Sequence, residues 1–247
     1  WVHGGGFDTG TENINPAGEP WLGFLAAGYA IVSVRYTYAP PAVYPIQTTE
    51  VARAVQFIRA NASQFNIDPN KVIGYGRSAG ADHVGFLAYG PEFQNTGSSD
   101  SILHEYSRPN AFINFQGQSH FTEMEPTMGL GARYFCSSLT YAQAQSDCAG
   151  DLLDFSLTRQ IGLHHVTTPA PIFSYYTGAT SSPPGPPYTE IHDIVFGQMI
   201  QNALASEYGV LPTDIRNTYY SSLPDYTTQV RILTLAWLSD PAVGMNP

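Results

Sequence analysis

The chain has 247 residues, 43% of them hydrophobic, and carries 20 acidic against 10 basic side chains, for a formal net charge of −10. This length suits one α/β domain with a buried core, and the acidic balance argues against nucleic acid or an anionic membrane as a partner. No apolar run reaches the roughly 20 residues of a membrane span, and neither a signal peptide nor metal-ligand spacing of His and Cys is visible.

The first third of the chain alternates strand and helix patterns. Trp1-Val2 predicts the end of a strand, and residues 20–27 predict a short helix. Residues 29–34 form a continuous apolar run, which predicts a buried strand. Residues 48–62 repeat their apolar side chains with helical spacing. Residues 72–75 are apolar again and predict a further strand.

The same alternation continues to the C-terminus, which favours a parallel sheet flanked by helices. The remaining predicted elements, in chain order, are a helix at 79–89, a loop at 90–108, a strand at 111–115, an irregular insert at 119–165, a strand at 171–176, a loop at 181–187, a helix at 194–208, a short strand at 216–221 and a helix at 227–238. No repeat or second domain is visible, so residues 1–247 are predicted to form one domain.

The insert at residues 119–165 is predicted to be a small cap, and it contains both cysteines of the chain. Cys136 and Cys148 flank a short polar segment. Two cysteines this close within an irregular segment favour a disulfide over two free thiols. Together with a surface rich in uncharged polar residues, such a bridge indicates an extracellular or periplasmic protein, although the sequence fixes no compartment.

The most informative motif is Gly76-Arg77-Ser78-Ala79-Gly80, which fits G-x-S-x-G. It follows a predicted strand and precedes a predicted helix, as a nucleophile elbow requires. The glycines allow neighbouring backbone to pack closely while the turn exposes the serine hydroxyl at the C-terminal edge of a sheet. A serine retained in the fold without reactivity is the alternative, because its hydroxyl is a poor nucleophile without a base.

A second motif, His3-Gly4-Gly5-Gly6, supports the first. An H-G-G-G loop after a strand supplies backbone N–H groups to an oxyanion hole. The N–H groups of Gly4, Gly5 and Ala79 are therefore the predicted oxyanion donors. The two motifs together, in this order, are far more specific than either one alone.

Residues 1–90 resemble the α/β-hydrolase serine esterases, in particular the hormone-sensitive-lipase-like and bacterial carboxylesterase branch. The matching stretches are residues 2–7, residues 28–36, Tyr44-Pro45, residues 66–72 and residues 76–80. The resemblance implies hydrolysis of a small carboxylic ester through an acyl-serine on Ser78, without a cofactor, at the C-terminal edge of the sheet.

The N-terminal part departs from the family pattern. Family members carry further strands before the H-G-G-G loop, whereas this chain begins inside the strand that leads into it. The expected fold is thus an α/β-hydrolase without its first strands, with the strand ending at residues 1–3 left bare. A bare strand invites pairing with another chain, so we expect a homo-oligomer formed through this edge, unless the chain is a fragment whose missing strands come from elsewhere.

The triad acid and base also depart from the pattern. The turn Gly178-Ala179-Thr180-Ser181 has no carboxylate where the family places its acid, and Leu223-Pro224-Asp225-Tyr226 has no histidine where the family places its base. Asp225 is a weak base for a serine, because a carboxylate has a low pKa.

His192 is the first candidate for a relocated base, because its loop follows a strand on the same rim as Ser78. Asp193, and Glu190 before it, are the carboxylates that can orient this ring. The alternative for His192 is an exposed residue at the start of a helix.

The other histidines have weaker claims to the role of base. His120 is the second candidate, with Glu123 and Glu125 nearby, and a place in a cap loop is its alternative. His83 is expected to pack beneath the elbow. His3 is expected to hold the glycine loop, His164 and His165 to lie at the opposite edge of the sheet, and His104 to lie in a loop.

Two functions follow from these residues. The first is a carboxylic-ester hydrolase that uses Ser78, His192 and Asp193. The second is a catalytically impaired member of the same fold that binds a ligand or a partner in the former active-site pocket. The two differ in whether a histidine reaches Ser78.

Overall fold

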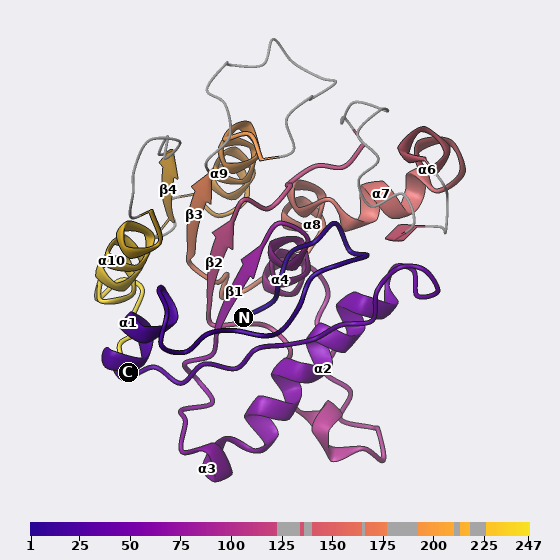
Figure 1. The fold of residues 1–247 in the computed structure, drawn as a ribbon. Helices are drawn as coiled ribbons and strands as arrows, with labels where there is room; N and C mark the ends of the chain where they lie inside the picture. The colour runs from indigo at the N-terminus through magenta and orange to yellow at the C-terminus, as the bar shows by residue number, and fades with distance from the viewer. Residues whose placement is uncertain (123–133, 136–139, 165, 177–191, 210–212, 218–225) are drawn as a thin grey trace.

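A computed structural model describes the chain except for residues 123–133, 136–139, 165, 177–191, 210–212 and 218–225 (Figure 1). Its centre is a parallel sheet with the strand order β1-β2-β3-β4. The strands are β1 (Ile73–Arg77), β2 (Ala111–Phe115), β3 (Ile172–Tyr176) and β4 (Thr213–Asn217). The mixed α/β class with a parallel sheet is therefore confirmed, and only β4 lies earlier in the chain than predicted.

The N-terminal residues extend the sheet beyond β1. Val2 forms parallel bridges with Gly76 on one side and with Val34 on the other. The N–H of Val2 donates to the carbonyl of Tyr75 at 2.8 Å, and the N–H of Val34 donates to the carbonyl of Trp1 at 2.9 Å. The expectation that residues 1–3 form the bare edge is therefore wrong, because backbone flanks them on both sides.

Residues 29–34 form the outermost segment on this side of the described sheet. They were predicted to be a buried strand, but Val34 alone forms a bridge, and Val32 is 41% exposed. A continuous apolar run predicts burial on both faces, whereas here the segment pairs with residues 1–2 and packs less tightly. The predicted buried strand is thus wrong in both burial and regularity.

Helices cover both faces of the sheet (Figure 1). One face carries α1 (Trp21–Ala26) and α10 (Tyr226–Leu238), whose Trp21 and Val230 share a buried cluster with Phe115. The helices on the other face are α2 (Ile46–Ala60), α4 (Ala79–Tyr89), α8 (Leu157–Leu163) and α9 (Val195–Tyr208). Two short elements, α3 (Ala62–Phe65) and the 3-10 helix η1 (Ser101–His104), complete this part.

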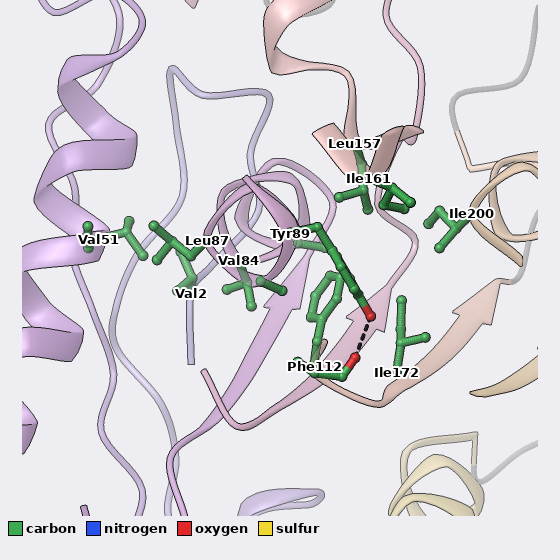
Figure 2. Packing of buried hydrophobic residues seen from close by; sticks show 14 of the residues in the cluster. Val2, Val51, Val84, Leu87, Tyr89, Phe112, Leu157, Ile161, Ile172 and Ile200 are labelled. Carbon is green, nitrogen blue, oxygen red and sulfur yellow. Dashed lines mark hydrogen bonds between the residues drawn. The ribbon is translucent and has the colours of Figure 1, made fainter. Parts of the chain in front are cut away.

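Helix α4 is the centre of the larger core cluster, and all its residues are buried. Val84 and Leu87 face α2 and the sheet, while Phe112 lies below them, as Figure 2 shows. The Tyr89 hydroxyl donates a hydrogen bond to the carbonyl of Ala170, so the polar end of this buried ring is satisfied. Such burial fixes the N-terminal end of α4, which begins immediately after Ser78.

Residues 119–165 were predicted to be irregular, but their described part contains α6 (Tyr141–Asp147), α7 (Ala149–Phe155) and α8. Thr140 and Gln143 form a capping box at the start of α6, a local signal that the prediction missed. Cys148 is disulfide-bonded. Its only possible partner within the chain, Cys136, lies outside the described residues.

Candidate active site

Ser78 occupies a strained turn between β1 and α4. Its φ of 49° and ψ of −127° lie in a backbone region that residues other than glycine rarely adopt. The Ser78 N–H donates to the carbonyl of Phe115 at 2.8 Å, and the Ser78 carbonyl accepts from the N–H of Ala81 at 2.7 Å. These bonds tie the turn to β2 and to the first turn of α4, so the serine has the backbone geometry of a nucleophile elbow.

The elbow glycines are required by close contacts rather than by flexibility. A Cβ at Gly76 would lie 2.4 Å from the Cα of Ala81, and one at Gly80 would lie 2.1 Å from the carbonyl oxygen of Val2. Both obstacles are backbone atoms and cannot rotate away. The prediction that these glycines allow neighbouring backbone to pack closely is therefore confirmed.

The glycine-rich loop lies directly against the elbow. A Cβ at Gly4 would lie 2.8 Å from the carbonyl oxygen of Arg77 and 3.1 Å from the Cβ of Ser78. Gly5 has a φ of 127°, and its carbonyl accepts from the N–H of Thr9 at 3.0 Å. Ala79 is the first residue of α4, so its N–H has no acceptor within the helix. Gly4 and Ala79 thus lie directly against Ser78, and Gly5 follows Gly4 in the same loop.

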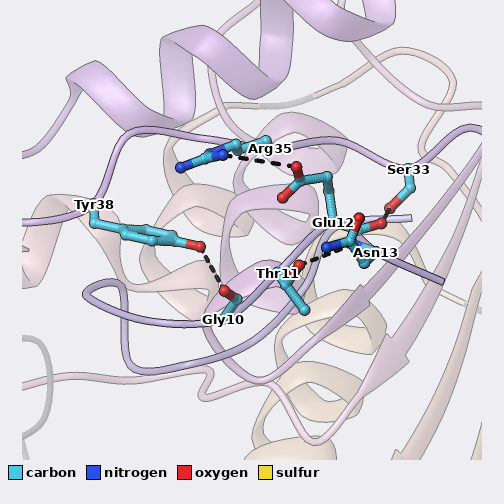
Figure 3. A network of polar contacts seen from close by, with 7 residues as sticks. All are labelled: Gly10, Thr11, Glu12, Asn13, Ser33, Arg35 and Tyr38. Carbon is cyan, nitrogen blue, oxygen red and sulfur yellow. Dashed lines mark hydrogen bonds and ion pairs between the residues drawn. The ribbon is translucent and has the colours of Figure 1, made fainter.

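The far end of the same loop is held by a polar network (Figure 3). The Tyr38 hydroxyl donates to the carbonyl of Gly10 at 2.6 Å, and the Ser33 hydroxyl donates to the carbonyl of Glu12 at 2.5 Å. The Glu12 carboxylate also lies 3.7 Å from the Arg35 guanidinium. This ion pair is exposed and contributes little, but the hydrogen bonds fix the loop against residues 33–38.

His3 supports the loop from beneath. Its ring is buried and stacks on Tyr36, with 4.5 Å between the ring centroids. Its Nδ1 lies 2.8 Å from the carbonyl oxygen of Gly4, which places the ring beside the first residue of the predicted oxyanion loop. The expected supporting position of His3 is confirmed.

His192 reaches Ser78 from the loop between β3 and α9. Its Nε2 lies 3.2 Å from the Oγ of Ser78, and its ring is half-buried. This is hydrogen-bond distance for a base that takes a serine proton. The two residues are 114 positions apart in the chain.

The other described histidines are engaged elsewhere. His83 is fully buried beneath the elbow, with Nδ1 3.0 Å from the Thr48 hydroxyl, and burial lowers its pKa to about 3. The ring of His120 lies between the hydroxyls of Thr158 and Thr122, each 2.9 Å from one ring nitrogen. The packing predicted for His83 is confirmed.

Two further histidines lie in other parts of the chain. His104 contacts the carbonyl of Ser98 at 2.8 Å, and His164 follows α8. His165, Glu190 and Asp225, together with Glu123 and Glu125, lie outside the described residues.

Asp193, the residue after the candidate base, is buried. Its Oδ1 accepts from the N–H of Val195 at 3.0 Å, so the carboxylate caps the first turn of α9. This local bond anchors the loop that carries His192, and the sequence Asp193-Ile194-Val195 at a helix start is its signal.

Asp82 is a second buried carboxyl that the sequence reasoning missed. It lies one turn after Ser78 on α4, and its Oδ1 accepts from the N–H of Gln118 at 2.7 Å. Burial raises the pKa of Asp82 well above its usual range. An acidic residue in an otherwise apolar helix, four positions after the nucleophile, is the signal that could have found it.

The described residues contain neither a metal-binding group nor a membrane-spanning helix. No group of three or more His, Cys, Asp or Glu side chains among them could hold a metal ion. Among the helices that the structure describes, none has the length and apolarity to cross a membrane.

The parallel sheet, the elbow after β1 and the glycine loop beside it define the α/β-hydrolase fold. Solved structures agree. An acetyl ester-xyloside bifunctional hydrolase from Caldicellulosiruptor lactoaceticus superimposes with a TM-score of 0.72 at 15% identity, covering 100% of this chain and 83% of the other. At this identity the likeness concerns the fold alone.

The family model BD-FAE matches residues 1–160, and the chain belongs to this family. Among curated proteins, Gut esterase 1 of Caenorhabditis elegans is 28% identical over 112 residues, which are 42% of this chain and 20% of that protein. The probable carboxylic ester hydrolase LipM of Mycobacterium tuberculosis is 28% identical over 132 residues, which are 51% of this chain and 29% of LipM. The matched regions are therefore less than a third of these relatives' length.

Proposed function

We propose that this chain hydrolyses carboxylic esters through an acyl intermediate on Ser78. The observation that carries the proposal is the 3.2 Å separation of His192 Nε2 and Ser78 Oγ at a strained elbow. Membership of the BD-FAE family, and the esterase names of two relatives, support the same reaction class.

The proposed first half-reaction forms the acyl-enzyme. His192 Nε2 takes the proton of the Ser78 hydroxyl while Oγ attacks the ester carbonyl carbon. The negative charge that develops on the carbonyl oxygen is stabilised by N–H groups of Gly4, Gly5 and Ala79. Collapse of the tetrahedral intermediate breaks the C–O bond, and the imidazolium returns its proton to the departing alcohol.

The proposed second half-reaction releases the acid. His192 takes a proton from water, the resulting nucleophile attacks the acyl carbon, and the proton passes to Ser78 Oγ as the acid departs. Asp193 is the proposed acid of the triad, because it is buried and follows His192 directly, and a carboxylate near an imidazole favours the protonated form of that imidazole. The substrate is a small ester, and the chemistry requires no cofactor.

The test is covalent labelling combined with hydrolysis. Wild-type protein is incubated with a p-nitrophenyl alkylphosphonate, and the modified residue is located by mass spectrometry. We expect the label on Ser78 and hydrolysis of p-nitrophenyl acetate that Ser78→Ala reduces by at least roughly 10³-fold. Folded wild type that neither takes the label nor hydrolyses the ester would replace this proposal with a binding role.

A further inference from the structure

Arg77, the residue immediately before Ser78, has no role in the proposed reaction, yet its side chain stands at the same edge of the sheet. Along β1, Gly74 and Gly76 face α4, because a Cβ at either would meet Val84 or Ala81. Side chains alternate along a strand, so Tyr75 and Arg77 face the side that α1 and α10 cover. Arg77 is exposed there.

The Arg77 guanidinium rests on an aromatic surface. Its Cζ lies 5.5 Å from the centroid of the Phe115 ring, within the range of a cation–π contact. Beside it is a hollow of about 180 Å³, lined by Trp1, Pro20, Trp21, Tyr75, Arg77, Phe115 and Val230. An apolar cavity of about 150 Å³ can hold a benzene ring, so this hollow has the size and lining for one aromatic ring.

The charge of Arg77 is not neutralised by the described residues. Three other arginines form ion pairs, Arg35 with Glu12, Arg53 with Asp100 and Arg231 with Glu19. No carboxylate among the described residues pairs with Arg77. The chain as a whole is acidic, with 20 acidic and 10 basic side chains. An anionic substrate therefore needs a local cation to offset the overall negative field.

We propose that Arg77 and the adjoining hollow form a subsite for an aromatic ring that carries a carboxylate, as part of the ester substrate. The guanidinium fork suits the two oxygens of a carboxylate. The aromatic walls contact the ring, and Arg77 ends β1 directly before Ser78, so the subsite lies at the edge of the sheet from which the elbow projects. This inference rests on the proposed esterase function and names the substrate class, which is an aryl ester with a carboxylate on its leaving group.

The first experiment compares 4-acetoxybenzoate with its neutral analogue 4-acetoxybenzamide. The ratio of their kcat/KM values is measured for wild type, Arg77→Met and Arg159→Met. Arg159 is an exposed arginine of α8, so its variant makes the same charge change away from the elbow. We expect Arg77→Met to lower the ratio at least roughly tenfold, as loss of a charge-assisted hydrogen bond does. Arg159→Met should leave it within about twofold.

The second experiment separates binding from chemistry. In the Ser78→Ala background, 4-hydroxybenzoate is titrated while the tryptophan fluorescence of the protein is followed, since Trp1 and Trp21 line the hollow. We expect saturable quenching that Arg77→Met removes and that added salt weakens. An unchanged substrate ratio in Arg77→Met, together with unchanged quenching, would overturn the subsite even in an active esterase. Quenching that depends on Arg77 in a protein that hydrolyses no ester would instead keep the subsite and overturn the proposed function.

Discussion

Ser78 and His192 approach each other from two regions that are fixed in different ways. The elbow is held by backbone against backbone: Gly76 against Ala81, Gly80 against Val2 and Gly4 against Arg77. His192 is held by a loop between β3 and α9, which is anchored in its described part by the Asp193 cap. Contacts of the first kind require glycine, while contacts of the second kind tolerate many sequences.

Each half of the site therefore responds differently to substitution. A substitution at a close-contact glycine acts on the backbone and moves several groups together. A substitution of His192 removes one side chain and leaves the elbow bonds to Phe115 and Ala81 in place. The two regions can therefore be tested separately.

The largest expected effect comes from the loop side. We expect His192→Ala to lower kcat for p-nitrophenyl acetate by roughly 10³-fold or more, because Ser78 then lacks a base, with little change in the free energy of unfolding. His120→Ala is the matched control, since its ring is bonded to Thr158 and Thr122, and it should stay within about twofold. Equal rates in the two variants would remove His192 from the mechanism.

The next effect comes from the elbow side. Gly4→Ala places a Cβ 2.8 Å from the carbonyl oxygen of Arg77. The loop must therefore shift away from Ser78, and its N–H groups no longer point toward the substrate carbonyl oxygen. We expect kcat to fall by about 10²–10³-fold, the loss typical of one oxyanion donor. Gly150→Ala in α7, where a Cβ meets nothing within 4 Å, is the control. Full activity in Gly4→Ala would show that this loop does not supply the oxyanion hole.

The elbow could be predicted from sequence because its close backbone contacts require glycine at fixed positions around the serine. Gly76 and Gly80 flank Ser78, and the structure shows that neither tolerates a Cβ. The position of His192 could be predicted from topology alone, since loops after parallel strands share one rim. Its 3.2 Å approach to Ser78 depends on the path of its loop, which no local pattern encodes.

Other features could not be predicted because they depend on distant partners. The apolar run at residues 29–34 shows that the segment is hydrophobic but not how many neighbours it has, and Val32 is in fact exposed. The bare edge was placed at residues 1–3 for the same reason, since the bridge from Val2 to Val34 joins segments far apart in sequence. Oligomerisation through a sheet edge stays a prediction.

The smallest expected effect concerns a buried group that the elbow side must accommodate. Asp82 accepts one hydrogen bond from Gln118 with Oδ1, and its Oδ2 is buried without a partner among the described residues. Burial raises the pKa of this carboxyl well above its ordinary value of 3.8. The folded state therefore binds the proton more tightly, so the contribution of Asp82 to stability is complete at low pH and is lost as the pH rises above about 4.

Asp82→Asn should remove this pH dependence, because an amide keeps the acceptor for Gln118 and never ionises. We expect the free energy of unfolding of the variant, relative to that of wild type, to be larger at pH 8 than at pH 4. Urea denaturation of both proteins at pH 4, 6 and 8 measures the difference between their free energies of unfolding at each pH. His83, with a pKa lowered to about 3, destabilises the fold below about pH 6.5 in both proteins and so cancels in the comparison. A difference between the two proteins that stays constant with pH would mean that Asp82 does not titrate abnormally, and that the elbow tolerates a buried charge.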